Sequence, residues 1–107
     1  KYLIFLMWPI TFYKIKDRSM EPSLMDGDYV LSNNLLYLVA DPSIGDIVIV
    51  KHPIKNKKII KRVHSKKNKK YFIIGDNIEN SDDSRRFGEI DKSLIIGKMI
   101  WHISKRK

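Results

Sequence analysis

The serine of the segment Ser19-Met20-Glu21-Pro22 and the lysine of Ile60-Lys61-Arg62 are the residues of this chain best suited to covalent catalysis. A serine hydroxyl is a weak nucleophile at neutral pH and needs a neighbouring base. His64 is close to the lysine in sequence, but no orienting carboxylate lies beside it. A Ser–Lys pair, which is a known variant of triad chemistry, is therefore the more economical interpretation.

Lys61 lies in residues 57–64, a segment that we predict to be a β-strand. On a strand it shares one face with Ile59 and Val63. Desolvation on such an apolar face disfavours the ammonium form. A base needs this effect, because a free lysine with a pKa near ~10.4 is protonated at neutral pH. The alternative is a lysine at a strand edge whose stem lies along the surface and whose ammonium reaches water.

Ser19 lies between a weak strand and Pro22, so we expect it to project from a turn, where a serine ordinarily has no further role. A long polar loop, residues 75–88, begins with Gly75-Asp76-Asn77 and continues through Asn80-Ser81-Asp82-Asp83-Ser84-Arg85. Its many oxygens suggest a calcium site, but the spacing does not match an EF-hand and two arginines lie inside it. We expect instead that Asp83 pairs with an arginine and that the loop holds a hydroxyl, such as that of Ser81, against a neutral lysine amine.

The chain of 107 residues predicts one domain with a small core. With 43% hydrophobic and 31% charged residues it is not a disordered chain, and without cysteine it has no disulfide framework. Short apolar segments separated by turns predict a mainly β domain. We place strands at 12–16, 29–32, 35–39, 47–51, 57–64, 71–74 and 94–103, with Gly97 at a bulge or bend of the last strand. No long segment has helical periodicity.

The formal net charge of +9 is compatible with binding to nucleic acid or to anionic lipid. Many of the lysines fall in residues 55–58 and 66–70, which look like polar turns between strands. No aromatic residues alternate with these lysines, as a surface for stacking single-stranded nucleic acid would require. We therefore expect no nucleic acid partner.

Residues 1–13 form an apolar N-terminal segment, which we separate from a catalytic domain at residues 14–107. The apolar run from Tyr2 to Tyr13 has 12 residues, whereas a spanning helix needs about 20. Three interpretations are open: the end of a membrane anchor, an interfacial segment with Trp8 at headgroup level, or a plain first strand. We favour contact with a membrane.

Four segments in this order resemble the successive sequence motifs of type I signal peptidases, which are Ser–Lys endopeptidases. They are Ser19-Met20-Glu21-Pro22-Ser23-Leu24, Gly45-Asp46-Ile47-Val48, Lys61-Arg62-Val63, and Gly75-Asp76-Asn77 with Asn80-Ser81-Asp82-Asp83-Ser84-Arg85 and Gly88. The resemblance runs from about Ser19 to the C-terminus. A lysine at position 61, rather than histidine, resembles the bacterial and organellar branch.

The resemblance implies a role for each matching residue. Ser19 would be the nucleophile and provide the backbone N–H for the oxyanion, Lys61 would be the general base, and Ser81 would orient Lys61. Asp83 and Arg85 would form an ion pair that stiffens the loop. The subsites for small side chains would be lined by Ile15, Leu24 and Ile60.

The implied fold is a twisted, mostly antiparallel β domain of the signal-peptidase and LexA-like type, without the large second domain that bigger members insert between Val63 and Ile74. The implied partners are polypeptides with an N-terminal signal or leader peptide and a membrane surface, and we expect a monomer that needs no cofactor or metal. The catalytic domain would lie on the extracytoplasmic side. Compactness and the segment Lys51-His52-Pro53 also resemble small proteases proposed to trim the leader of nickel-type superoxide dismutase, which would act in the cytoplasm.

One departure from the family pattern concerns the oxyanion. Many bacterial members have serine or glycine two residues before the nucleophile, where this chain has Asp17. An ionised carboxylate would repel a developing oxyanion, so we expect either that Asp17 points away or that the Ser19 N–H carries more of the stabilisation.

Two further functions stay open. A self-cleaving repressor-type peptidase shares the Ser–Lys chemistry, although no helix-turn-helix pattern is visible. A basic, non-enzymatic binding module is supported by the net charge alone.

Overall fold

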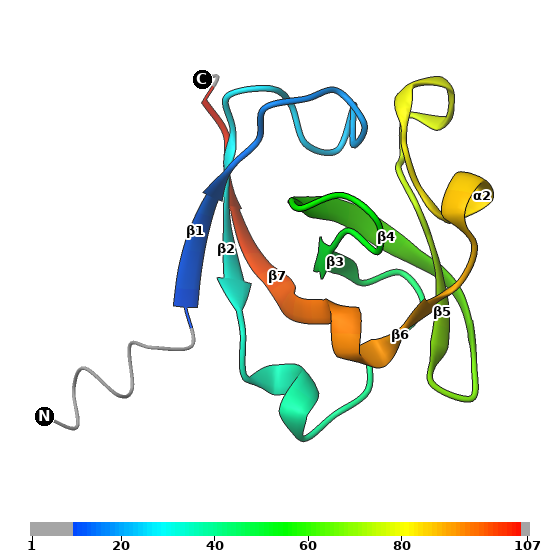
Figure 1. Cartoon of the computed structure of the whole chain (residues 1–107). Coiled ribbons are helices and arrows are strands. Elements are labelled where there is room, and N and C mark those ends of the chain that lie inside the picture. Colours follow the sequence, from blue (N-terminus) through cyan, green and yellow to red (C-terminus); the bar gives the residue numbers. More distant parts are fainter. Residues whose placement is uncertain (1–9, 106–107) are drawn as a thin grey trace, which may run out of the picture.

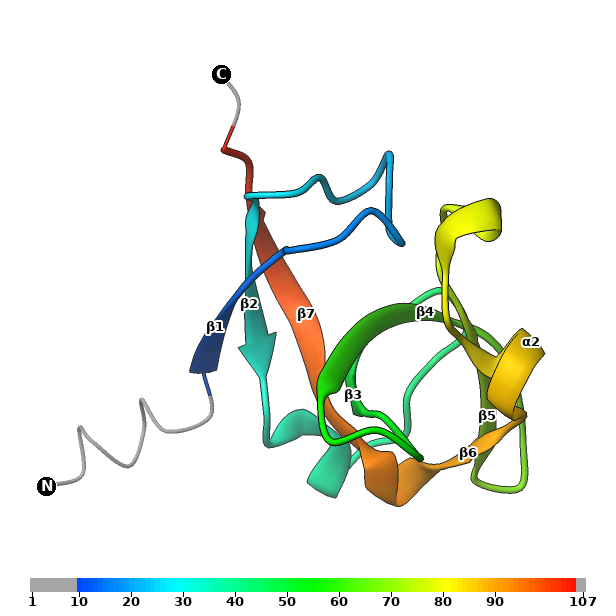
Figure 2. The ribbon, with the colours of Figure 1, turned by 45° about the horizontal axis from the view of Figure 1, so that its top comes forward.

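A single antiparallel sheet of seven strands makes up most of the structure, a computed structural model that describes residues 10–105. The strands are β1 (Ile10–Lys14), β2 (Tyr29–Asn33), β3 (Ile47–Lys51), β4 (Lys58–Lys67), β5 (Lys70–Ile74), β6 (Ile90–Asp91) and β7 (Ile95–Ile103). Their order across the sheet is β1-β2-β7-β3-β4-β5-β6. The sheet curls, so that β3 to β6 wrap round beside the flatter β1-β2-β7 part (Figures 1 and 2). The predicted mainly β, antiparallel fold is confirmed.

Helical structure is limited to short turns in the described residues. The four-residue helix α2 (Ser84–Phe87) lies in the polar loop, and three 3-10 turns occur at η1 (Leu36–Leu38), η2 (Ile78–Asn80) and η3 (Lys92–Leu94). Among residues 10–105, no helix is long and apolar enough to span a bilayer. The predicted N-terminal segment, residues 1–13, lies mainly outside the described residues, and its last four residues belong to β1.

The strand predicted at residues 35–39 is wrong, because this segment forms η1. The Asn33 side chain accepts hydrogen bonds from the backbone N–H groups of Leu35 and Leu36, at 2.9 and 3.1 Å. These bonds turn the chain out of the extended conformation at the end of β2. A local side-chain bond therefore prevails over the strand preference of an apolar run.

The β4–β5 connection is shorter than the predicted turn at residues 66–70. Lys67 pairs with Lys70, and the two residues between them, Asn68 and Lys69, have φ angles of 52° and 65°. Two successive positive φ angles are typical of a type I′ hairpin turn, which matches the twist of the adjoining strands. This tight turn leaves no inserted domain between β4 and β5, as expected.

Strand β3 is buried on both faces, which explains its uninterrupted apolar sequence. Val48 and Val50 belong to one apolar cluster, shared mainly with β4, β5 and β7, and Ile49 belongs to a second cluster around Met20 and Leu24. The predicted bounds of this strand, residues 47–51, are confirmed. Because β3 pairs with β7 on one side and β4 on the other, it joins the two parts of the curled sheet.

Gly97 lies at an irregularity in β7, as predicted. Ile49 of β3 pairs with Gly97 and Val50 pairs with Ile95, so one extra β7 residue bulges out of the ladder. A Cβ atom at position 97 would overlap the side chain of Ser32 on β2. Glycine therefore permits the close approach of β2 and β7.

Candidate active site

Strand β4 places Lys61 in the interior of the molecule. Lys61 is 2% exposed, and its neighbours on the same strand face, Ile59 and Val63, are buried as expected. On the adjacent strand it pairs with Val48, which is fully buried. The edge-lysine alternative is therefore excluded, because the ammonium does not reach water.

The turn that carries Ser19 is held by two sets of contacts. Met20 and Leu24 are each 1% exposed and pack into the second apolar cluster, which anchors the turn to the core. The polar loop provides the other contacts: the Asn77 N–H donates to the Ser19 carbonyl oxygen at 2.8 Å. The Ser23 hydroxyl donates to Asp76 at 2.6 Å. The polar loop after β5 thus fixes the position of Ser19.

Ser19 and Lys61 meet in this interior site. Lys61 Nζ donates a hydrogen bond to Ser19 Oγ at 2.8 Å, and both side chains are buried. Burial lowers the pKa of Lys61 below its ordinary value of 10.5, although the carboxylates of Asp17, Asp83 and Asp82 oppose part of this effect. A buried amine with a lowered pKa next to a hydroxyl is an arrangement that can transfer a proton.

Asp83 and Arg85 form an ion pair at the start of α2. Arg85 Nε and Nη2 donate to the two carboxylate oxygens of Asp83 at 2.9 and 3.0 Å. Asp83 is fully buried and also accepts from the Gly75 N–H at 2.9 Å. Burial alone would raise the pKa of Asp83, but the hydrogen bonds from Arg85 and Gly75 lower it to about 2. The pair thus joins the start of α2 to Gly75 and Ile78 in the first part of the loop.

Ser81 lies inside this loop, close to Ser19, but its hydroxyl makes no hydrogen bond to Lys61. A Cβ atom at Gly75 would overlap both the Ser81 side chain and the Ser19 carbonyl oxygen. Ser81 Oγ is near enough to Asp83 to help lower its pKa, yet it is buried and makes no hydrogen bond of normal geometry within the described residues. The lack of a side chain at Gly75 therefore creates the space that Ser81 and Ser19 share.

A second anchor of the loop, His52–Asp82, was missed by sequence reasoning. His52 is 4% exposed, and its Nε2 lies 2.9 Å from Asp82 Oδ2. Its Nδ1 accepts from the backbone N–H groups of Ile54 and Lys55, so Nε2 carries the hydrogen and donates to Asp82. This histidine links the end of β3 to the loop. A histidine followed by Pro53, opposite a carboxylate-rich loop, is the signal that could have indicated it.

Asp17 points toward Ser19 and not away from it. Asp17 Oδ1 accepts a hydrogen bond from the Ser19 N–H at 3.1 Å and another from Ser19 Oγ at 3.0 Å. The expectation that the carboxylate points away is therefore wrong. The Ser19 N–H, which we expected to stabilise the oxyanion, donates to Asp17 in this structure.

A small cavity of about 160 Å³ opens beside Ser19. Its wall includes the two predicted subsite residues Ile15 and Ile60, together with Asp17 and Lys58. Leu24, the third predicted subsite residue, is buried in the core and does not line this cavity. The size of the cavity suits a small side chain.

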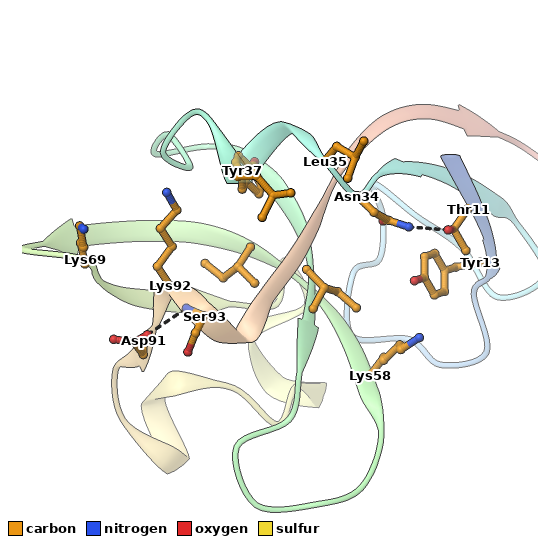
Figure 3. Close-up of a pocket in the computed structure, with 13 residues that line it drawn as sticks. Thr11, Tyr13, Asn34, Leu35, Tyr37, Lys58, Lys69, Asp91, Lys92 and Ser93 are labelled. Atoms are coloured by element: carbon orange, nitrogen blue, oxygen red, sulfur yellow. Dashed lines mark hydrogen bonds between the residues drawn. The ribbon is translucent and has the colours of Figure 1, made fainter. Parts of the chain in front are cut away.

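A larger cavity of about 770 Å³ has Lys58 in its wall, as the small cavity does. Figure 3 shows Tyr13 on one side of it, Tyr37 and Leu35 on another, and Lys69, Asp91 and Lys92 farther along. Within residues 10–105, two strand edges without a partner strand lie beside this region. Residues 58–60 of β4 pair with β3 alone there, because β5 pairs from Arg62 onward. Among the same residues, strand β1 pairs with β2 alone.

Metal binding has no structural counterpart in the described part of the chain. No group of histidine, aspartate and glutamate side chains there is placed to hold a metal ion. The loop carboxylates that suggested calcium are engaged by cations instead: Asp83 by Arg85, and Asp82 by Lys55 at 3.4 Å.

Comparison with known proteins gives one consistent family. The family model described as signal peptidase, peptidase S26, matches residues 2–66 and 64–103. Signal peptidase I of Aquifex aeolicus is 45% identical over 53 residues, which cover 48% of this chain and 20% of that protein. Signal peptidase IB of Staphylococcus aureus is 28% identical over 156 aligned residues, which cover 92% of this chain and 81% of that protein.

The two matched pieces of the family model meet at residues 64–66, inside the β4–β5 hairpin. The alignment with the Staphylococcus aureus protein is also longer than this chain, so that relative has additional residues within the aligned region. The junction of the two matched pieces agrees with the short hairpin between β4 and β5.

Proposed function

Because this chain belongs to the signal peptidase family, peptidase S26, we propose that it is a serine endopeptidase that removes N-terminal signal or leader peptides. Ser19 is the nucleophile and Lys61 the general base. The observation that carries this assignment is the 2.8 Å contact between a buried lysine amine and a serine hydroxyl. Within residues 10–105, no carboxylate lies within hydrogen-bond distance of Lys61. Burial of such a lysine destabilises a fold, and residues that do so are common at functional sites.

The reaction proceeds in two half-reactions. Ser19 Oγ attacks the carbonyl carbon of the scissile bond while its proton passes to neutral Lys61. Lys61 then gives that proton to the leaving amine as the C–N bond breaks, which leaves an acyl-enzyme on Ser19. Next, Lys61 takes a proton from water, and the resulting hydroxide adds to the ester. Collapse of this second tetrahedral species releases the acid and returns the proton to Ser19 Oγ.

The substrate lies as an extended strand between the unpaired edges of β1 and β4. Main-chain hydrogen bonds to such edges provide affinity, and pockets for alternate side chains provide specificity. The cavity of about 160 Å³ between Ile15 and Ile60 accepts the small side chain that precedes the scissile bond. The larger cavity of about 770 Å³ accepts residues of the leader.

The polar loop acts as a rigid support for the dyad. Asp83 and Arg85 hold its shape, and Ser81 orients the Lys61 amine when Lys61 is neutral. Support for this role of Ser81 comes from its position against Gly75 and Ser19 and from its buried hydroxyl, which makes no hydrogen bond of normal geometry in the described residues and could turn to Lys61.

The membrane-facing surface is the exposed side of β1, β2 and β7. Phe12 and Trp101 are 63% and 64% exposed, and both pair with Leu31 of the strand between them. Aromatic side chains favour the headgroup region of a bilayer. In a density-gradient flotation assay, we expect the protein to bind anionic lipid vesicles and to be recovered with them. A smaller fraction of the Phe12→Ser, Trp101→Ser double variant should be recovered with the vesicles. Equal flotation of the two proteins would contradict this surface.

A leader-bearing polypeptide incubated with the full chain tests the assignment. We expect mass spectrometry to find one cleavage, and Ser19→Ala or Lys61→Ala to abolish it while the circular dichroism spectrum is unchanged. Ser65→Ala and Lys67→Ala are matched controls on exposed positions of β4 and should cleave normally. Full activity of either dyad variant would overturn the mechanism.

A further inference from the structure

The Asp17 carboxylate makes two contacts with the nucleophile in the free protein. One oxygen, Oδ1, accepts from the Ser19 N–H at 3.1 Å and from Ser19 Oγ at 3.0 Å. Ser19 supplies both hydrogen bonds that this carboxylate accepts within the described residues. The same hydroxyl oxygen receives the hydrogen bond from Lys61 Nζ. Ser19 is thus held between a carboxylate and an amine.

This arrangement opposes each early step of the proposed reaction. The Ser19 N–H cannot donate to an oxyanion while it donates to Asp17, and a carboxylate at that place would repel the oxyanion. The hydroxyl proton is directed at Asp17 and not at Lys61, the base that should receive it. The negative charge of Asp17 also favours the ammonium form of Lys61, which cannot accept a proton.

The hydrogen bonds between Asp17 and Ser19 can nevertheless be replaced when a ligand binds. Asp17 is an exposed residue in a turn, so water can replace its contacts with Ser19. It also lines the small cavity together with Ile15 and Ile60. A side chain that enters this cavity, and a carbonyl oxygen that approaches the Ser19 N–H, would both compete with Asp17 for the same space.

We propose that Asp17 is an inhibitory latch that holds Ser19 in a resting state until the bound polypeptide displaces the carboxylate from the Ser19 N–H and hydroxyl. This inference rests on the proposed function, since it concerns the same nucleophile. The latch limits reaction of the free enzyme with compounds that do not fill the cavity. A leader substrate that fills it releases the nucleophile at the moment of binding.

The test compares Asp17→Asn and Asp17→Gly with the unchanged protein and with Asp26→Asn. Asp26 is an exposed aspartate in the next turn, so this control removes the same charge away from the nucleophile. The first readout is the rate at which a small fluorophosphonate probe phosphonylates Ser19 Oγ, with fluoride as the leaving group. We expect this rate to rise about tenfold in Asp17→Gly, because a hydrogen bond to a charged group no longer holds the donor, and to be unchanged in Asp26→Asn.

The second readout is the pH profile of leader cleavage. Loss of the Asp17 charge should move the acid limb to lower pH, because Lys61 then loses its proton more readily. Asp82 and Asp83, which favour the ammonium form, and Lys57, which disfavours it, are the other charged groups that act on Lys61, and they are unchanged in these variants. A purely structural role of Asp17 would not move this limb. Asp17→Asn, which keeps the size of the side chain, gives the same information if Asp17→Gly unfolds.

The outcomes separate the two proposals. Equal or slower phosphonylation of Ser19 in both Asp17 variants, with normal cleavage by the unchanged protein and none by Ser19→Ala, would overturn the latch and leave the peptidase assignment intact. Cleavage that persists in Ser19→Ala would overturn the assignment itself, and the latch with it.

Discussion

Lys61 Nζ donates to Ser19 Oγ across 2.8 Å, although 42 residues separate them in the chain. The lysine comes from the centre of the sheet and the serine from a turn outside it. Four hydrogen bonds join that turn to the loop after β5. The Asn77 N–H and side chain donate to the carbonyl oxygens of Ser19 and Arg18, the Asp76 N–H donates to the sulfur of Met20, and the Ser23 hydroxyl donates to Asp76. Arg62, next to Lys61, also binds Asp76 at 2.8 Å. One loop thus positions both reacting groups.

Lys61→Met should abolish cleavage and stabilise the fold. Burial lowers the pKa of Lys61, so the unfolded chain binds more protons than the folded one at pH values between the folded pKa and 10.5. The free energy of unfolding of the unchanged protein should therefore rise with pH through that window, and below it the penalty is fully present. Lys61→Met lacks this penalty, and we expect a gain of about 1–3 kcal/mol at neutral pH. Urea unfolding at several pH values measures both effects.

The matched control for that experiment is Lys67→Met, which changes an exposed lysine of the same strand. It should leave the pH dependence of the free energy of unfolding as it is.

In the unchanged protein, kcat/KM should increase with pH as Lys61 loses its proton, with a midpoint below 10.5. A rate that is flat from neutral to alkaline pH would argue against a lysine base.

Ser81→Ala should lower kcat about tenfold with little change in stability. Its hydroxyl is buried without a hydrogen bond of normal geometry in the described residues, but it lies near enough to Asp83 to help lower the pKa of that carboxyl, so we expect its removal to change the free energy of unfolding by less than about 1 kcal/mol. Ser84→Ala is the contrasting control, because Ser84 Oγ accepts from the Ile73 N–H at 2.9 Å and its loss should destabilise the fold. A normal kcat for Ser81→Ala would exclude Ser81 from orienting Lys61.

Ile60→Ala should change the preference at the cleavage site. Ile60 lines the cavity of about 160 Å³ beside Ser19, so a smaller side chain enlarges it. We expect the ratio of kcat/KM for valine against alanine before the scissile bond to rise about tenfold, since one methylene in a pocket is worth about 1–3 kcal/mol. Ile54→Ala, at a position 79% exposed, serves as the control. An unchanged ratio would place the subsite elsewhere.

Asp83→Asn should destabilise the protein at neutral pH by about 2–4 kcal/mol, because an amide has one acceptor oxygen for the donors of Arg85 and Gly75. The pKa of Asp83 is lowered to about 2 from 3.8. Its stabilising effect is therefore complete above pH 3.8 and lost as the pH falls toward 2. Acid titrations of the unchanged protein and the variant should converge in that range. Parallel curves would show that Asp83 does not titrate there.

Strand positions could largely be predicted from local pattern. The apolar run at residues 47–51 and the alternation around Lys61 are properties of adjacent residues, and both were confirmed. The η1 turn could not be predicted in the same way. It depends on a side-chain bond from Asn33 that competes with the strand preference of the following residues.

The sequence by itself determined which residue types were available for chemistry and which strand face Lys61 occupies, because side-chain alternation is local. Tertiary structure decided the rest: the 2.8 Å contact of Lys61 with Ser19, the overlap that forbids a side chain at Gly75, and the direction of Asp17. The first two depend on how distant segments pack after the sheet has curled. The direction of Asp17 depends on the backbone conformation of a turn that those segments hold.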